Sequence, residues 1–193
     1  MTKSILLVMD MINDLVGEDG PNKTTYVPLM AERKVLENTR DAIAAARKAG
    51  VLVGYVRVGF SPDYRECPPA SPVFTGARNN GLFKLGEKGT EVHPMLKPEP
   101  GDFDIVKHRV SPFYGTSLEP ILSARGIERI YLSGVSTNGV VHTGAREGHD
   151  RDFEMILLED CCAGSTRDEH ANALACVARF AAIKSSREID FSA

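Results

Sequence analysis

The sequence predicts an α/β fold, a three-layer α/β/α arrangement around a six-stranded parallel sheet. Short apolar runs alternate along the chain with longer amphipathic stretches, as in folds built from strand–helix–strand units with right-handed crossovers. The first run, Ser4–Met9, is apolar at nearly every position, which is typical of a parallel strand buried on both faces. A length of 193 residues suits one domain over residues 1–193.

The other elements follow from periodicity and from glycine positions. Met30–Ala49 has one apolar face at helical spacing and stops at Gly50, which favours a helix. Thr116–Arg125 is expected to form a helix closed by Gly126. Further strands are expected at Val51–Val58, Phe103–Lys107, Arg129–Ser133, Glu154–Leu158 and Ala181–Lys184, and further helices at Asn138–Asp150 and Arg167–Phe180.

Two connections stand out by composition. Asn13 to Pro28 is a polar loop that contains glycine, and Gly59 to Gly101 is rich in glycine, proline and charge. A connection as long as the second usually carries function or forms a lid. Within it, Thr90–Leu96 is expected to form a short helix.

Composition limits the classes of partner. A net charge of −3 gives no basic footprint for nucleic acid, and 42% hydrophobic with 25% charged residues is ordinary for a soluble globular protein. The apolar run Ile5–Met9 is too short for a membrane span, so we expect a cytoplasmic protein without a membrane partner. Free thiols in a reducing cytosol are expected for the four cysteines, Cys67, Cys161, Cys162 and Cys176.

Candidate catalytic residues lie where predicted strands end. Asp10 follows the first strand, Lys107 ends the third, and Ser133–Val140 continues the fourth into a helix. The carboxyl ends of parallel strands share one edge of a sheet, where ligands bind. Alone, Asp10 is either a general acid or base or a turn cap, and Lys107 is a solvated charge, a partner for Asp10 or an anion-binding group.

Several motifs occur in a fixed order along the chain. The segment from Lys107 to Leu118 matches Lys-x-x-x-Ser-x-Phe-x-Gly-Thr-x-Leu, and Gly134 to Val141 matches Gly-Val-x-Thr-Asn-x-Cys-Val except at the cysteine. With Arg146 and the acidic pair after the fifth strand, the chain resembles the isochorismatase-like, or cysteine hydrolase, superfamily. The resemblance implies the Rossmann-like isochorismatase fold, a small-molecule substrate, and a homo-oligomer (dimer or tetramer).

Val140 occupies the position of the superfamily's nucleophilic cysteine. A valine side chain has no lone pair, so covalent acyl-enzyme chemistry at residue 140 is excluded. The resemblance also implies a cis peptide bond between Val135 and Ser136. The backbone N–H groups of Ser136 and Val140 would then form an oxyanion hole that does not need the cysteine.

The leading interpretation is a hydrolase that works without a covalent thioester intermediate. Asp10 would be the acid or base and Lys107 its electrostatic partner, as in isochorismatases proper, which carry glycine at the nucleophile position and hydrolyse a vinyl ether. Valine is bulkier than glycine, which favours a smaller or differently oriented substrate. Substrate contacts are expected from Phe113, Arg57 and Thr137.

Alternatives concern the chemistry and the cofactors. The fold is also compatible with a catalytically inactive protein that binds a small molecule or a partner, and Val140 favours that interpretation. Arg57 is equally suited to a structural ion pair. No metal is expected, because Arg57 to Cys67 lacks the histidine of the superfamily's metal-binding nicotinamidases, and no nucleotide cofactor, because no Gly-x-Gly-x-x-Gly follows the first strand.

Overall fold

The computed structural model describes residues 2–192 and contains one six-stranded, fully parallel sheet. The strand order is β3-β2-β1-β4-β5-β6. The α/β fold class is therefore confirmed. The strands are β1 (Ser4–Met9), β2 (Leu52–Val58), β3 (Phe103–Lys107), β4 (Arg129–Val135), β5 (Glu154–Ala163) and β6 (Ala182–Lys184).

The helices lie between the strands, close to where the sequence predicts them. The expected helix Met30–Ala49 is wrong in one respect, because it is two helices separated at Lys34, whose φ of 54° is left-handed. The expected helix Thr90–Leu96 is instead two short 3-10 turns. The elements are α1 (Asn13–Val16), α2 (Val27–Arg33), α3 (Val35–Lys48), α4 (Pro72–Asn79), η1 (Lys88–Thr90), η2 (Pro94–Leu96), α5 (Leu118–Arg125), the π-helical turn η3 (Thr137–Val141), α6 (His142–His149), α7 (Arg167–Val177) and η4 (Ser186–Glu188).

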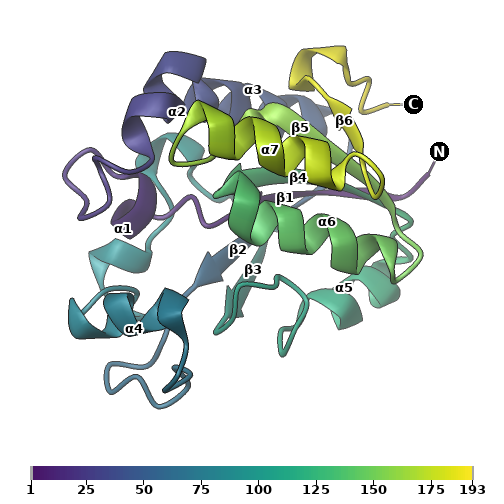
Figure 1. The fold of residues 1–193 in the computed structure, drawn as a ribbon. Coiled ribbons are helices and arrows are strands. Elements are labelled where there is room, and N and C mark those ends of the chain that lie inside the picture. Colours follow the sequence, from purple (N-terminus) through teal and green to yellow (C-terminus); the bar gives the residue numbers. More distant parts are fainter. Residues whose placement is uncertain (1, 193) are drawn as a thin grey trace.

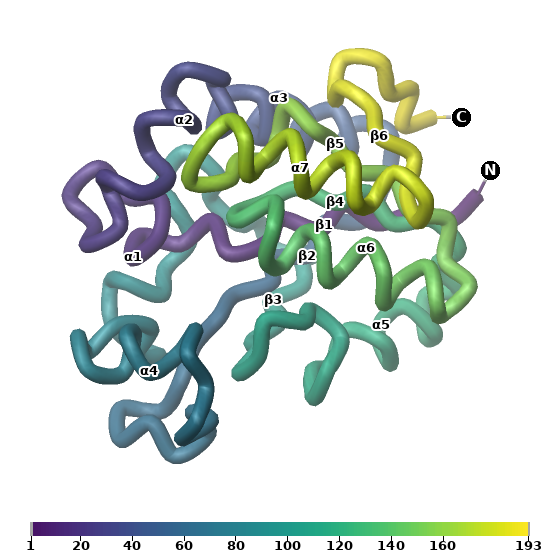
Figure 2. The backbone as a smooth tube through the Cα atoms, in the orientation of Figure 1, coloured from purple at the N-terminus to yellow at the C-terminus, as the bar shows by residue number. Residues whose placement is uncertain are grey.

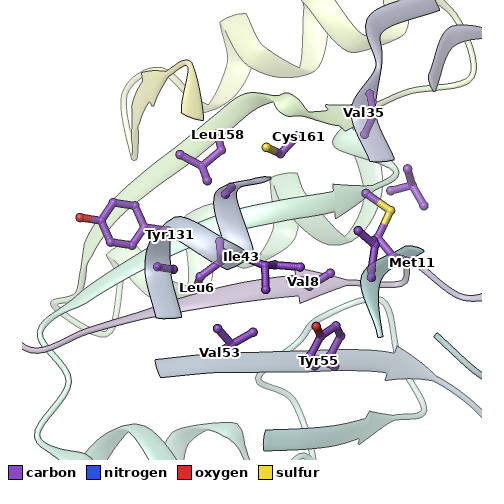
Figure 3. Packing of buried hydrophobic residues seen from close by; sticks show 14 of the residues in the cluster. Leu6, Val8, Met11, Val35, Ile43, Val53, Tyr55, Tyr131, Leu158 and Cys161 are labelled. Atoms are coloured by element: carbon purple, nitrogen blue, oxygen red, sulfur yellow. The ribbon is translucent and has the colours of Figure 1, made fainter. Parts of the chain in front are cut away.

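Helices cover both faces of the sheet (Figure 1). On one face α3 contributes Val35 and Ile43 to an apolar cluster with residues of β1 and β2, and Figure 3 shows Ile43 lying between Leu6 and Val8 of β1. On the other face α5, α6 and α7 bury apolar side chains against the odd-numbered residues of β1. Both faces of β1 are thus buried, in agreement with its continuous apolar run.

The strand order creates a switch point between β1 and β4. The chain moves from β1 outward through β2 to β3, and it returns through α5 to β4 on the opposite side of β1. Ligands bind in the crevice at such a point, beyond the carboxyl ends of the strands. The two strands are closely apposed here: Gly134 has a φ of 142°, and a Cβ on it would lie 2.2 Å from the Met9 carbonyl oxygen.

The long connection between β2 and β3 forms a separate projection. Figure 2 shows α4 and its flanking loops lying away from the helices that cover the sheet. A small apolar cluster that includes Phe60, Phe74 and Phe83 joins this projection to Ile12 and Val58. Within residues 2–192 no helix combines the length and the apolar character that crossing a membrane requires.

Candidate active site

A pocket of about 400 Å³ opens beyond the carboxyl ends of the central strands. Its polar lining comes from the ends of β1, β3 and β4 and from α2, and its apolar lining comes largely from α1 and the projection around α4. The lining residues are Asp10, Leu15, Tyr26, Val58, Val73, Phe74, Phe83, Lys107, Val110, Val135, Ser136, Asn138, Gly139, Val140 and Thr143.

A buried ion pair lies in this pocket. The Lys107 Nζ atom is 2.9 Å from Oδ2 of Asp10, and both residues are buried. The backbone N–H of Val58 donates a 2.8 Å hydrogen bond to the other carboxylate oxygen of Asp10. Lys107 also donates to the carbonyl oxygen of Arg109 at 3.0 Å. Every oxygen of the carboxylate therefore has a partner, which fixes its orientation toward the pocket.

The strand register explains how the pair forms. Asp10 is the first residue after β1 and has a φ of 56°, a left-handed conformation that aspartate adopts more readily than most residues. Lys107 ends β3, two strands away, with adjacent strands about 4.8 Å apart. Val58 of β2 lies between them in register with Lys107, so the long lysine side chain crosses above Val58 to reach Asp10.

The environment of Asp10 suits proton transfer. Burial raises the pKa of the Asp10 carboxyl, and the Lys107 ammonium and the Val58 N–H oppose that rise by favouring the carboxylate. A carboxyl group with a raised pKa holds its proton closer to neutral pH than a solvated one does. Asp10 can therefore give and take a proton within the pocket.

The turn after β4 brings backbone groups to the same pocket. The peptide bond between Val135 and Ser136 is cis, as expected. Gly139 has a φ of −108° and a ψ of −106°, and a Cβ on it would lie 2.7 Å from the hydroxyl oxygen of Ser136. Ser136, Gly139 and Val140 all line the pocket. Glycine at 139 thus allows the chain to fold tightly over Ser136 before α6 begins.

Val140 presents hydrocarbon where this turn meets the pocket. Its side chain is buried and belongs to the apolar cluster that also contains Met9 and Val141. The residue is therefore packed like a core side chain on one side while it borders the pocket on the other. Its side chain offers the pocket no reactive atom.

Tyr26 is a pocket residue that sequence reasoning missed. It lies directly before α2 and lines the pocket together with Ser136, whose side chain partly opposes the rise in the Tyr26 pKa. Burial raises the pKa of Tyr26, and the carboxylates of Glu169 and Asp10 raise it further. An aromatic residue within an otherwise polar loop was the one available signal, and it did not indicate which residue Tyr26 would meet.

Comparison with known proteins gives the family. The model of the isochorismatase domain matches residues 4–188. The chain belongs to the isochorismatase family. Ureidoacrylate amidohydrolase RutB of Methylorubrum extorquens is 34% identical over 171 residues, which cover 81% of this chain and 68% of that protein.

Solved structures with a similar fold agree with this assignment. N-carbamoylsarcosine amidase from Thermoplasma acidophilum superimposes with a TM-score of 0.78 at 29% identity, covering 98% of this chain and 99% of that one. An isochorismatase family protein from Desulfovibrio vulgaris has a TM-score of 0.86 at 21% identity, with 97% and 96% of the chains covered, and shares the fold. The chain is thus an isochorismatase-family hydrolase by fold and by sequence.

Arg57 lies outside the pocket of this family member, although the sequence suggested a substrate contact. Its guanidinium group makes two 2.7 Å hydrogen bonds to the Asp104 carboxylate and a 2.6 Å bond to the carbonyl oxygen of Thr90. Because neighbouring residues of a strand face opposite sides, Val58 lines the pocket and Arg57 points away from it. The structural ion pair is therefore the interpretation that the geometry favours.

The structure also places Phe113 and Thr137 away from the pocket lining. Phe113 is buried in the core, where its ring stacks on Phe153 at a centroid distance of 6.3 Å. Thr137 is fully buried, and its hydroxyl group lies 2.8 Å from Nδ1 of His170. Both residues pack beneath the turn that lines the pocket. Phe113 belongs to the same apolar cluster as Val140, and the hydrogen bond of Thr137 joins η3 to His170 of α7.

The remaining cysteines offer no substitute for the missing nucleophile. Burial raises the pKa of the Cys161 thiol to about 12 and that of Cys162 well above its ordinary value. Neither cysteine lines the pocket. Across residues 2–192, no three histidine, cysteine, aspartate or glutamate side chains are grouped so that they could hold a metal ion.

Proposed function

We propose that this isochorismatase-family hydrolase cleaves a C–N or C–O bond of a small organic molecule without a covalent thioester intermediate. The observation that carries the proposal is the buried Asp10–Lys107 pair in a pocket whose nucleophile position is Val140. An acid–base group and its electrostatic partner remain, while the attacking thiol does not. Water must therefore supply the oxygen that enters the product.

Asp10 transfers the protons in the proposed reaction. The Asp10 carboxylate takes a proton from the attacking water, whose oxygen bonds to the electrophilic carbon, and the resulting carboxyl group donates that proton to the leaving nitrogen or oxygen as its bond to the carbon breaks. The Lys107 ammonium stabilises the carboxylate before the first step and after the second. One water molecule is consumed, and Asp10 ends the cycle as a carboxylate.

The turn after β4 supplies the second element of the proposal. The backbone N–H groups of Ser136 and Val140 would stabilise the negative oxygen that develops on a carbonyl substrate. Two similar proteins, an amidohydrolase and an amidase, support an amide-type C–N bond as the one cleaved. The pocket volume of about 400 Å³ favours a small substrate.

Replacement of Asp10 by asparagine tests the proposal. Asp10→Asn keeps the shape and most hydrogen bonds but removes the titrating proton, so turnover should fall at least about 100-fold. Asp104→Asn is the matched control, since Asp104 also pairs with a basic residue of a neighbouring strand but lies outside the pocket. Turnover by a folded Asp10→Asn protein at the rate of the unmodified enzyme would overturn the proposal.

Val140 itself favours a second candidate, a protein that binds a small molecule or a partner without turnover. Loss of the nucleophile is the expected first change when a hydrolase becomes a binding protein. Retention of both Asp10 and Lys107 argues against it. A panel of amides, esters and vinyl ethers separates the two candidates: thermal stabilisation by a ligand that is never consumed would support the binder.

Three expectations from the sequence stay predictions. These are a single domain over residues 1–193, of which residues 1 and 193 lie outside the described part, a cytoplasmic location, and a dimer or tetramer. Light scattering on the purified protein measures the last of them directly.

A further inference from the structure

The charges of the pocket balance one another. Among the described residues that line it, only Asp10 and Lys107 have acidic or basic side chains of opposite charge type, and they are paired at 2.9 Å. The Lys107 ammonium is further engaged by the Arg109 carbonyl oxygen. Both side chains are buried, so the lysine is not free to move toward a bound anion. No arginine belongs to the described lining.

The guanidinium groups of Arg57 and Arg109 form their hydrogen bonds away from the pocket. Arg57 is paired with Asp104 outside the pocket. The Arg109 guanidinium donates to the backbone carbonyl oxygens of Glu66 and His108 at 2.9 and 2.6 Å. These hydrogen bonds turn both arginine side chains toward other parts of the molecule, and neither residue lines the pocket.

The uncharged lining divides into two parts. Hydroxyl and amide groups of Tyr26, Ser136, Asn138 and Thr143 can donate and accept hydrogen bonds without charge. The other part is hydrocarbon, supplied mainly by Leu15, Val73, Phe74, Phe83 and Val110. A ligand that fits this lining has one polar group of the amide kind and an apolar remainder.

From this distribution, and resting on the proposed hydrolysis, we propose that the substrate is an uncharged small amide with an apolar acyl chain, and that amides bearing a carboxylate on that chain are excluded. The scissile carbonyl would face Ser136 and Val140, and the chain would lie against Val73 and Phe83. A carboxylate at the end of the chain would lose part of its hydration against hydrocarbon, with no unpaired cation in the described lining to compensate for that loss. The amides of the turn cannot serve it, because they bind the reacting oxygen.

A pair of amides with the same carbon chain tests the inference. Butyramide and succinamate differ only in that a methyl group of the first is a carboxylate in the second. Binding to the intact protein is measured by isothermal titration calorimetry, and turnover by ammonia release. We expect butyramide to bind and to be hydrolysed with a kcat/KM at least about tenfold above that of succinamate. Equal or tighter binding of succinamate would overturn the inference, and so would binding of neither amide.

The same experiment separates this inference from the proposed function. Preferential binding of butyramide without ammonia release would support the neutral specificity and overturn the hydrolysis. Hydrolysis of both amides at similar kcat/KM would support the hydrolase and overturn the neutral specificity.

Val73 allows a gain-of-binding control. It lies on α4 at the rim of the pocket and is 62% exposed, so a long side chain is accommodated there. Val73→Arg should supply the missing cation and raise the affinity for succinamate about tenfold relative to Val73→Gln, which is also unbranched and polar but is shorter and has no charge. Equal affinities of the two variants for succinamate would overturn the electrostatic basis of the inference.

Discussion

Two ion pairs at neighbouring strand ends have similar geometry and different roles. Lys107 and Asp10 are 2.9 Å apart with side chains 2% and 7% exposed, whereas Arg57 and Asp104 are 2.7 Å apart with side chains 19% and 59% exposed. The shorter pair lies outside the pocket and the longer one within it. The N···O distance therefore does not distinguish the two pairs. Their side-chain burial and the face of the sheet on which they lie do.

The difference between the pairs originates in the alternation of side chains between the two faces of a strand. Asp104 and Lys107 are both on β3 but three positions apart, so their side chains leave opposite faces. Arg57 and Val58 are adjacent on β2 and also face opposite sides. One residue of shift in either strand would exchange the buried and exposed partners, which is why the register of β2 with β3 determines the site.

The largest expected effect on stability comes from a substitution of Gly134, which lies on β4 next to the end of β1. Gly134→Ala places a Cβ 2.2 Å from the Met9 carbonyl oxygen and forces β4 away from β1, the strand that carries Asp10. We expect a loss of about 4 kcal/mol in the free energy of unfolding, measured by urea titration. Gly76→Ala is the control, because nothing lies within 4 Å of its new Cβ on α4. It should stabilise the protein by about 0.5–1 kcal/mol, and equal effects of the two changes would contradict this account.

A smaller effect is expected from removing one partner of the buried pair. Lys107→Met leaves the Asp10 carboxylate without a counter-charge, and it should cost about 3 kcal/mol of unfolding free energy. Turnover should also fall at least about 100-fold, because the stabilised carboxylate of the proposed cycle is lost. Asp104→Asn disrupts the exposed pair and should cost less than about 1 kcal/mol in the same titration. Similar losses from the two substitutions would show that burial does not distinguish the pairs.

The smallest expected effect is on the pH dependence of stability. Because burial raises the pKa of Asp10 above its ordinary value of 3.8, the folded state binds this proton more tightly than the unfolded state does. Asp10 therefore contributes stability fully below pH 3.8, and this contribution is lost as pH rises through the raised pKa. The unfolding free energy of the unmodified protein minus that of Asp10→Asn should fall as pH increases from that value. A difference that grows with pH would mean that the ion pair outweighs burial.

Much of the fold follows from the sequence because its signals are local. Apolar runs gave the parallel strands, and Gly50 and Gly126 gave helix ends close to those observed. The break at Lys34 was missed because a lysine carries no turn signal and rarely adopts the left-handed conformation that it has at the junction of α2 and α3. The α4 helix was hidden in a segment whose glycine and proline content indicated a loop.

The site was partly foreseeable for the same reason. Asp10, Lys107 and the turn at Ser136 fall at strand ends, and strand ends meet at one edge of a parallel sheet. Arg57 also lies near the end of a strand, β2. The face of the sheet to which its side chain points depends on the pleat and the register of the strand, which composition does not reveal. Tyr26, Phe74 and Phe83 reach the pocket through long connections, and the sequence does not encode where such a connection folds back.

Hydrolysis without an enzyme-bound intermediate is the central claim, and rapid-quench intact-mass spectrometry during turnover of butyramide tests it most directly. The account predicts that ammonia is released while the mass of the wild-type chain stays unchanged, whereas Val140→Cys, which restores a thiol beside the Asp10–Lys107 pair, gains the mass of one acyl group. An acyl adduct on the wild-type chain would contradict the account.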